Sequence, residues 1–165
     1  MTIWTITPEG PGSPVAAALW RAYYTEVSDR WYLRHEGRRT DPAELERAIA
    51  AHPGSELTAP TGRLLVARYD GVPAGSAGVR LLDAATAELT RVFVHEGLRG
   101  LGGAALLVAA AEDAARALGA GRMVLDTRTD LVEARALYAR LGYTEGEPHN
   151  DDVYAEHWFR KDLVN

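Results

Sequence analysis

The sequence contains no cysteine, only one lysine (Lys161) and no long apolar run. Without cysteine the chain can form no disulfide, no thiolate-bound zinc site and no cysteine nucleophile. The net charge of −5 argues against a duplex-DNA-binding protein, because such domains tend to be basic. A content of 47% hydrophobic and 25% charged residues is instead typical of a globular protein, and a length of 165 residues predicts one domain over residues 1–165.

Signals for a membrane or for export are also missing. A membrane-spanning helix needs about 18 consecutive apolar residues, and the most apolar segment, 103–111, ends at Glu112. Trp4, Pro8 and Pro14 interrupt the region where a signal peptide needs an unbroken apolar stretch. We therefore expect a cytoplasmic protein that binds neither membranes nor nucleic acids.

Hydrophobic periodicity and turn signals predict helices alternating with strands. Ser13 and Asp41 are each followed by proline, as at helix starts, and Asp70-Gly71 is a two-residue hairpin signal. The polar segment 32–40 is predicted to be a turn. The expected strands are 2–7, 63–69, 72–82, 86–94, 122–126, 143–147 and 153–161, and the expected helices are 13–28, 42–51, 101–118 and 131–141. The predicted fold is α/β, with the order β-α-α-β-β-β-α-β-α-β-β and a mixed, mostly antiparallel sheet flanked by helices.

The segment 92–105 is the most informative part of the chain, because a strand ends there, a glycine-rich loop follows and a helix begins. Such a helix N-terminus presents unpaired amides and the positive end of the helix dipole, which suit a phosphate group. Glycines allow close approach to the backbone, and Arg99 adds a positive charge.

Three interpretations of this loop compete. Its glycines could only allow close packing. Residues 100–105 also satisfy the dinucleotide-binding pattern G-x-G-x-x-A, with Asp126 ending the next strand. Five intervening residues (95–99) and a preceding antiparallel hairpin argue against that fold. The third interpretation is a coenzyme A site.

Two motifs favour the third interpretation. Arg99-Gly-Leu-Gly-Gly-Ala104 resembles the R/Q-x-x-G-x-G/A signature of the GNAT superfamily of N-acetyltransferases. The segment from Ala134 to Tyr143 resembles that family's A-x-x-L-Y-x-x-x-G-F/Y motif. The match covers residues 86–143, whereas residues 1–60 are less diagnostic.

The resemblance implies direct transfer of an acetyl group from acetyl-CoA to a primary amine of a small molecule, in a ternary complex without a covalent enzyme intermediate. In this family the loop amides bind the pyrophosphate and the preceding strand binds pantetheine. The implied cofactor contacts are Val92, Phe93, Val94, Arg99, Gly100, Leu101, Gly102, Gly103 and Ala104. Dimers are common in the family, so a homodimer is possible.

The resemblance also implies catalytic roles for Tyr138 and Glu88. The hydroxyl of Tyr138 would donate a proton or hydrogen bond to the coenzyme A thiolate, although the residue also lies on an apolar helix face. Glu88 is the candidate base, since a regular strand puts it on one face with Thr90, Val92 and Val94. A solvent-facing carboxylate is the alternative, and a bulge would change this phase.

Other positions are less specific. Leu131 stands where many family members have an asparagine that contacts coenzyme A, which leaves Thr129 or Arg128 as candidate replacements. Asp151-Asp152 could attract a basic acceptor, but a solvated turn is the preferred interpretation. The aromatic residues near the first helix could line an acceptor pocket, although their spacing favours packing: Trp20, Tyr23, Tyr24, Trp31 and Tyr32. The histidines lack metal-ligand spacing, so no metal site is predicted: His35, His52, His95, His149 and His157.

Two other functions remain open at this stage. One is a noncatalytic module that senses acyl-CoA, and the other is a nucleotide-binding oxidoreductase domain. The acceptor also remains open between an amino acid, a polyamine, an antibiotic and a protein terminus.

Overall fold

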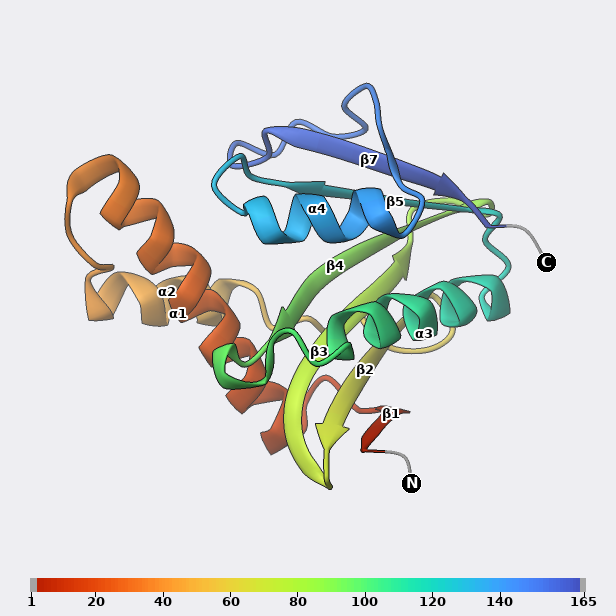
Figure 1. Cartoon of the computed structure of the whole chain (residues 1–165), viewed down its shortest axis with the longest axis horizontal. Helices are drawn as coiled ribbons and strands as arrows, with labels where there is room; N and C mark the ends of the chain where they lie inside the picture. Colours follow the sequence, from red (N-terminus) through yellow and green to blue (C-terminus); the bar gives the residue numbers. More distant parts are fainter. Residues whose placement is uncertain (1–2, 164–165) are drawn as a thin grey trace.

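The computed structural model describes residues 3–163 and contains the predicted succession of helices and strands (Figure 1). The strands are β1 (Trp4–Pro8), β2 (Gly62–Tyr69), β3 (Val72–Leu81), β4 (Thr86–Val94), β5 (Arg122–Thr127), β6 (Thr144–Glu145) and β7 (His157–Asp162). The helices are α1 (Pro14–Glu36), α2 (Pro42–Ala51), the short 3-10 helix η1 (Glu96–Leu98), α3 (Gly103–Ala117) and α4 (Val132–Arg140). No helix within residues 3–163 is both long and apolar enough to span a bilayer.

The first two helices begin where the sequence predicts. Ser13 and Asp41 are their N-caps, and each side chain accepts a hydrogen bond from a backbone amide of the first turn. Helix α1 continues to Glu36, however, and Gly37 ends it with a φ of 67°. The prediction that segment 32–40 is a turn is therefore wrong for residues 32–36. Ion pairs on this polar part of α1 explain the extension, as in the contact of Arg34 with Asp130.

The seven strands form one sheet in the order β1-β2-β3-β4-β5-β7-β6. Every neighbouring pair is antiparallel except β4 and β5, which are parallel. The β2–β3 hairpin turns at Asp70 and Gly71, whose φ values of 49° and 83° fit a primed turn. The predicted mixed, mostly antiparallel sheet is thus confirmed.

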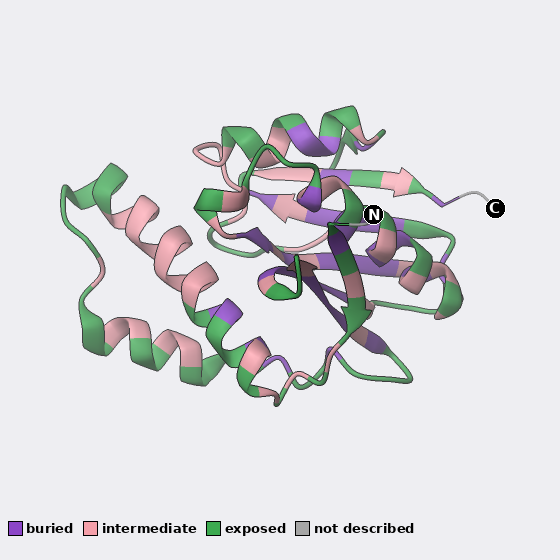
Figure 2. Ribbon diagram, turned by 60° about the horizontal axis from the view of Figure 1, so that its bottom comes forward, coloured by how far each residue is buried: buried purple, intermediate pink, exposed green. Residues whose placement is uncertain are grey.

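Helices cover both faces of the sheet (Figure 2). Helices α3 and α4 pack on one face, where Leu107 and Leu137 join the main apolar core with Leu65 and Leu125. The first turns of α1 pack on the other face, in a smaller cluster that contains Leu64. Because Leu64 and Leu65 are consecutive, they show the alternation that a strand buried on both faces requires.

The last two strands are shorter than predicted. Strand β6 contains two residues and β7 begins at His157, so the predicted strands 143–147 and 153–161 are both too long. A loop, residues 146–156, connects them and contacts the sheet on the face opposite α3 and α4, where the amide of Asn150 donates to Asp126. Loop 146–156 thereby brings polar side chains onto the middle of the sheet.

Candidate active site

Strands β4 and β5 pair over only three residues of each strand. The parallel pairing joins Thr86–Glu88 to Arg122–Val124, and beyond it the two strands diverge. From Leu89 onward β4 is hydrogen-bonded to β3 but has no β5 partner within the described chain. We call the place where the strands part the β4–β5 junction. An unpaired strand edge inside a sheet can offer backbone hydrogen bonds to a ligand.

A bulge in β4 changes which side chains share a face. Its register with β3 shifts near Arg91, whose φ is 55°. Glu88 and Thr90 point away from the α3 face, whereas Val92 and Val94 pack into the core on that face. The prediction that Glu88 shares a face with both valines is therefore wrong, because it assumed a regular strand.

The bulge is stabilised by aromatic residues of α1. Arg91 is buried, and its guanidinium lies 4.5 Å from the ring centre of Trp20 and 5.4 Å from that of Tyr24. Trp20 and Tyr24 thus pack, as the sequence favoured. Tyr23 lies at the junction instead, with its ring 6.2 Å from Phe93. Burial raises the pKa of Tyr23 to about 12.

The glycine-rich loop presents unused amides at the start of α3. Gly100 and Gly102 have φ values of 81° and 88°, and nothing lies within 4 Å of the Cβ position of either. The first α3 amide bonded to a described residue is that of Leu106, which donates to Gly102. Within residues 3–163 no protein oxygen accepts from the amides of residues 100–105. The loop is thus a fit for a diphosphate, which would take these hydrogen bonds.

Gly103 has a different role from the other two glycines. A Cβ on Gly103 would lie 2.4 Å from the ring of Trp4, so this glycine allows the tryptophan to pack against the helix start. The Trp4 indole nitrogen also donates to the carbonyl oxygen of Leu101 over 3.0 Å. Gly103 therefore fits the interpretation in which the loop glycines allow close packing.

Arg99 connects the loop to α1 and to β4. Its Nε donates to the carbonyl oxygen of Val94 over 2.8 Å, and its Nη2 contacts both carboxylate oxygens of Glu26 at 2.7 and 2.8 Å. The positive charge of Arg99 is therefore paired with Glu26, although the side chain also lies beside the loop amides.

Tyr138 is on α4 and lies at the β4–β5 junction, on the face of the sheet that α4 covers. The residue is 6% exposed, and its ring packs against Tyr143 and Phe159. Its hydroxyl makes no hydrogen bond to another residue in the described part of the chain, whereas Tyr143 donates to Glu112 over 2.9 Å. Burial, with smaller contributions from Tyr23 and Asp126, raises the pKa of Tyr138 well above its ordinary value. Tyr138 is therefore a protonated donor at neutral pH, and it packs in the core as well.

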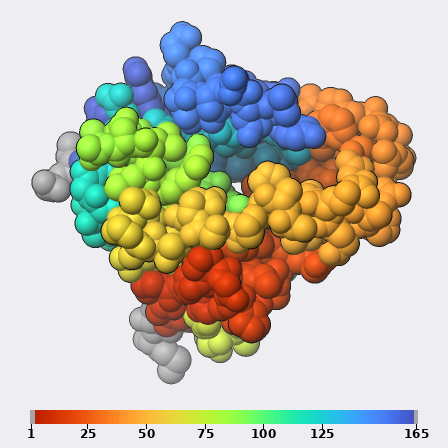
Figure 3. Space-filling model, turned by 180° about the vertical axis from the view of Figure 1, so that it is seen from behind, coloured from red at the N-terminus to blue at the C-terminus, as the bar shows by residue number. Residues whose placement is uncertain are grey.

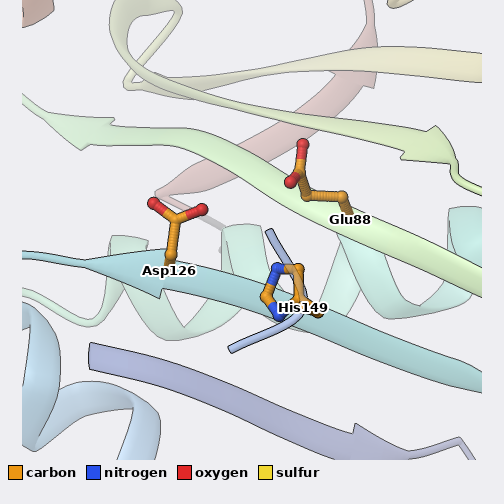
Figure 4. Close-up of side chains that lie close together, drawn as sticks. All are labelled: Glu88, Asp126 and His149. Atoms are coloured by element: carbon orange, nitrogen blue, oxygen red, sulfur yellow. The ribbon is translucent and has the colours of Figure 1, made fainter. Parts of the chain in front are cut away.

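On the opposite face, Glu88, Asp126 and His149 converge (Figure 4). One oxygen or ring nitrogen from each lies within 4.8 Å of those from the other two. Glu88 is 9% exposed and accepts from Arg80 Nε over 2.9 Å, while Asp126 accepts from Asn150 over 2.8 Å. A hollow lies near the centre of this face, between loop 146–156 and the segment after α2 (Figure 3).

Sequence reasoning missed two members of this group. Asp126 entered only through the dinucleotide alternative, which used its position at the end of a predicted strand; its place two residues beyond the partner of Glu88 is known only from the pairing in the folded sheet. His149 had no such signal, because a long loop carries it to the sheet.

The two candidate replacements for the family asparagine have partners of their own. Arg128 pairs with Asp130, with two nitrogen–oxygen distances of 3.0 Å, and the Thr129 hydroxyl is 3.0 Å from His157 Nε2. Leu131 precedes α4 and supplies no side-chain cap. Asp151 and Asp152 are exposed in a turn, as expected.

Solved structures of other proteins share the fold of this chain. The chain resembles PaiA N-acetyltransferase from Thermoplasma acidophilum in complex with coenzyme A, at 14% identity and a TM-score of 0.73 over 98% of this chain and 99% of that one. It also resembles a Klebsiella pneumoniae protein assigned as an acyl-CoA N-acyltransferase, at 23% identity and a TM-score of 0.72, with the same coverage. A third similar structure is a GNAT acetyltransferase from Elizabethkingia anophelis with acetyl-CoA bound, at 15% identity and a TM-score of 0.65 over 99% of this chain and 100% of that one.

At these identities the structural likeness shows the fold alone, and no curated protein sequence matches the chain. The family itself follows from the sequence model of the acetyltransferase (GNAT) family, which matches residues 16–143, well over half of the chain. The chain therefore belongs to the GNAT family of acetyltransferases.

Proposed function

We propose that the protein transfers the acetyl group of acetyl-CoA to a primary amine of a small molecule. The observation that carries the proposal is the set of unused amides at residues 100–105, at one end of the same junction that Tyr138 and Glu88 border. Two of the similar structures contain coenzyme A or acetyl-CoA, which supports the same ligand here.

The amides of residues 100–105 and the positive end of the α3 dipole would hold the diphosphate. Arg99 adds charge beside them, reduced by its pairing with Glu26. The unpaired edge of β4, including residues 92–94, would bind the pantetheine amides as a neighbouring strand does. Acetyl-CoA supplies the acetyl group as a thioester.

The reaction then requires one proton to be taken from the amine and another to be donated to the departing sulfur. At neutral pH an aliphatic amine is an ammonium, with a pKa of about 10.4, so a protein group or a water must take a proton from it. Glu88 lies on the sheet face opposite α3 and α4, where the amine would approach and which we call the acceptor side, and its carboxylate accepts one hydrogen bond from Arg80 Nε. On the other side, the Tyr138 hydroxyl has no protein partner in residues 3–163 and can donate to the departing sulfur. Because the chain has no cysteine, direct transfer between the two substrates is the simplest route.

A thiol-release assay with acetyl-CoA and a panel of amines tests the proposal. The panel contains amino acids, spermidine, aminoglycosides and a short peptide. Since the protein has no thiol of its own, the thiol reagent reports only coenzyme A. We expect release with at least one amine class and formation of its N-acetyl product. Tight binding of acetyl-CoA in a calorimeter without release from any amine would contradict the proposal and favour a noncatalytic sensor.

A further inference from the structure

Three proton-accepting groups meet on the acceptor side of the junction, from parts of the chain far apart in sequence. Glu88 is on β4, Asp126 is on β5 and His149 is in loop 146–156 (Figure 4). One acceptor atom of each is within 4.8 Å of the other two. A nitrogen atom at the centre of a triangle of that size is no more than about 2.8 Å from every corner, which is within hydrogen-bonding distance.

The two carboxylates are held in place but retain acceptor positions. Glu88 accepts from Arg80, and Asp126 accepts from Asn150, whose own oxygen accepts from the Trp158 indole nitrogen over 2.9 Å. A carboxylate has about four acceptor positions, so these donors leave several unused on each. The protein thus fixes both carboxylates before a ligand binds.

One ring nitrogen of His149 lacks a hydrogen-bond partner within residues 3–163. Its Nε2 is buried and forms no hydrogen bond with any group in the described chain. Buried ring nitrogens are normally paired, so this atom indicates a missing ligand or solvent partner. The ring lies beside two carboxylates, and a primary ammonium, with three N–H donors, would match the three acceptors.

A divalent metal ion fits the same place less well. The Arg80 guanidinium is 2.9 Å from Glu88, and the Asn150 side chain presents its NH₂ group, a donor, to Asp126. The guanidinium repels a dication more strongly than a singly charged ammonium, which can also donate hydrogen bonds to the acceptor positions that remain.

We propose that Glu88, Asp126 and His149 bind the ammonium group of the acceptor, and that His149 takes a proton from it. This inference rests on the proposed function and assigns the acceptor side of the same site. One N–H bond of the ammonium breaks, its proton goes to a ring nitrogen of His149, and the amine keeps the electron pair for attack. The two carboxylates stabilise the imidazolium that forms. Glu88 and Asp126 thereby bind and position, and His149 is the base.

Other charged groups also surround His149. Arg80 is connected to His149 only indirectly, through its ion pair with Glu88. A cavity of about 100 Å³ beside the imidazole is lined by Arg122, Glu147 and Arg160. Removing a carboxylate should weaken binding of the ammonium, because the site loses a negative charge and a hydrogen-bond acceptor.

The kinetic test compares His149→Gln with His35→Gln, a matched change at an exposed histidine at the end of α1. With the best acceptor, we expect His149→Gln to lower kcat about 100-fold and to remove the acidic limb of kcat/KM, with the affinity for acetyl-CoA unchanged. Asp126→Asn should raise the KM for the amine, because it removes a negative charge from the ammonium site. Equal activity and equal pH profiles of the two glutamine variants would overturn the proposal and leave the proposed function intact.

A binding test needs no turnover. In protein labelled with ¹³C-histidine, the ring signal of His149 is the one missing from His149→Gln. Titration with n-butylammonium should shift this signal saturably, whereas trimethylbutylammonium, which has the charge but no N–H donor, should not shift it. Equal responses to both ions, or none, would overturn the proposal, as would a saturable response to micromolar Zn²⁺ with loss of activity in a chelator. A response to n-butylammonium alone, without acetylation of any amine, would sustain ammonium binding and refute the proposed function.

Discussion

The two sides of the β4–β5 junction are built in different ways. On the side where we propose that acetyl-CoA binds, here called the donor side, six consecutive residues, 99–104, form the loop, and the groups they offer are backbone amides. On the acceptor side, the groups are side chains of Glu88, Asp126 and His149, which tertiary structure brings together. A site made of consecutive backbone is visible in the sequence, whereas a site of dispersed side chains appears only once the chain is folded. Four substitutions test the donor side of this contrast and the framework behind it, and the variants of His149 and Asp126 test the acceptor side.

The largest effect is expected in the framework behind the donor side. Glu112 on α3 is buried, accepts from the Tyr143 hydroxyl and is 3.1 Å from Lys161 Nζ. Glu112→Ala would leave both partners unmatched, so the free energy of unfolding should fall by about 3 kcal/mol in urea denaturation. Asp113→Ala, at the exposed neighbouring position, should cost less than about 1 kcal/mol. Equal losses for the two variants would show that burial of this network does not stabilise the fold.

The next largest effect is expected at Tyr138. Tyr138→Phe should lower kcat about 100-fold while the affinity for acetyl-CoA stays the same, because only the hydroxyl is lost. Since the pKa of Tyr138 is raised, its hydroxyl stays protonated, and deprotonation of this group should not lower the wild-type kcat below about pH 10. Calorimetry and pH-dependent turnover measure both quantities. A collapse in affinity with preserved turnover per bound cofactor would make Tyr138 a structural residue.

A smaller effect is expected in the loop itself. Gly102 has a φ of 88°, so Gly102→Ala strains the backbone by about 1–2 kcal/mol and should displace the loop amides. We expect the Kd for acetyl-CoA to rise about 10-fold in calorimetry. Gly97→Ala is the matched control, because Gly97 lies in open space nearby and has no left-handed φ. If Gly97→Ala weakened binding as much, the conformation of Gly102 would not be the cause.

The smallest effect concerns the charge at Arg99. Arg99→Ala should raise the Kd for acetyl-CoA about threefold, since the guanidinium is exposed in part and shared with Glu26. Glu26→Gln should leave that Kd unchanged or lower it slightly, because it frees the Arg99 charge for the diphosphate. Weaker binding in both variants would instead mean that Arg99 acts by bracing the loop against α1.

Local signals predicted most of the fold, since caps and turns depend on neighbouring residues. Ser13, Asp41 and the Asp70-Gly71 turn all lie where the sequence places them. The end of α1 was missed, because ion pairs with distant residues stabilise its polar last turns. The faces to which the β4 side chains point were predicted wrongly, because the bulge at Arg91 depends on aromatic rings from α1.

The site residues divide in the same way, into those that local motifs predict and those that only the tertiary structure brings together. The sequence singled out residues 99–104 and Tyr138, since motifs carry them. It did not separate Gly103, which packs on Trp4, from Gly100 and Gly102, whose positive φ values shape the loop. It also could not place His149 beside Asp126, because no local pattern determines where an eleven-residue loop lies.

The central claim is that the amides of residues 100–105 bind the diphosphate of the acetyl donor. Titration of ¹⁵N-labelled protein with coenzyme A, followed through its amide resonances, tests it most directly. We predict that the amide protons of residues 100–105 show the largest saturable changes, together with those on the unpaired edge of β4. Saturable binding that left the amides of residues 100–105 unmoved would contradict the claim.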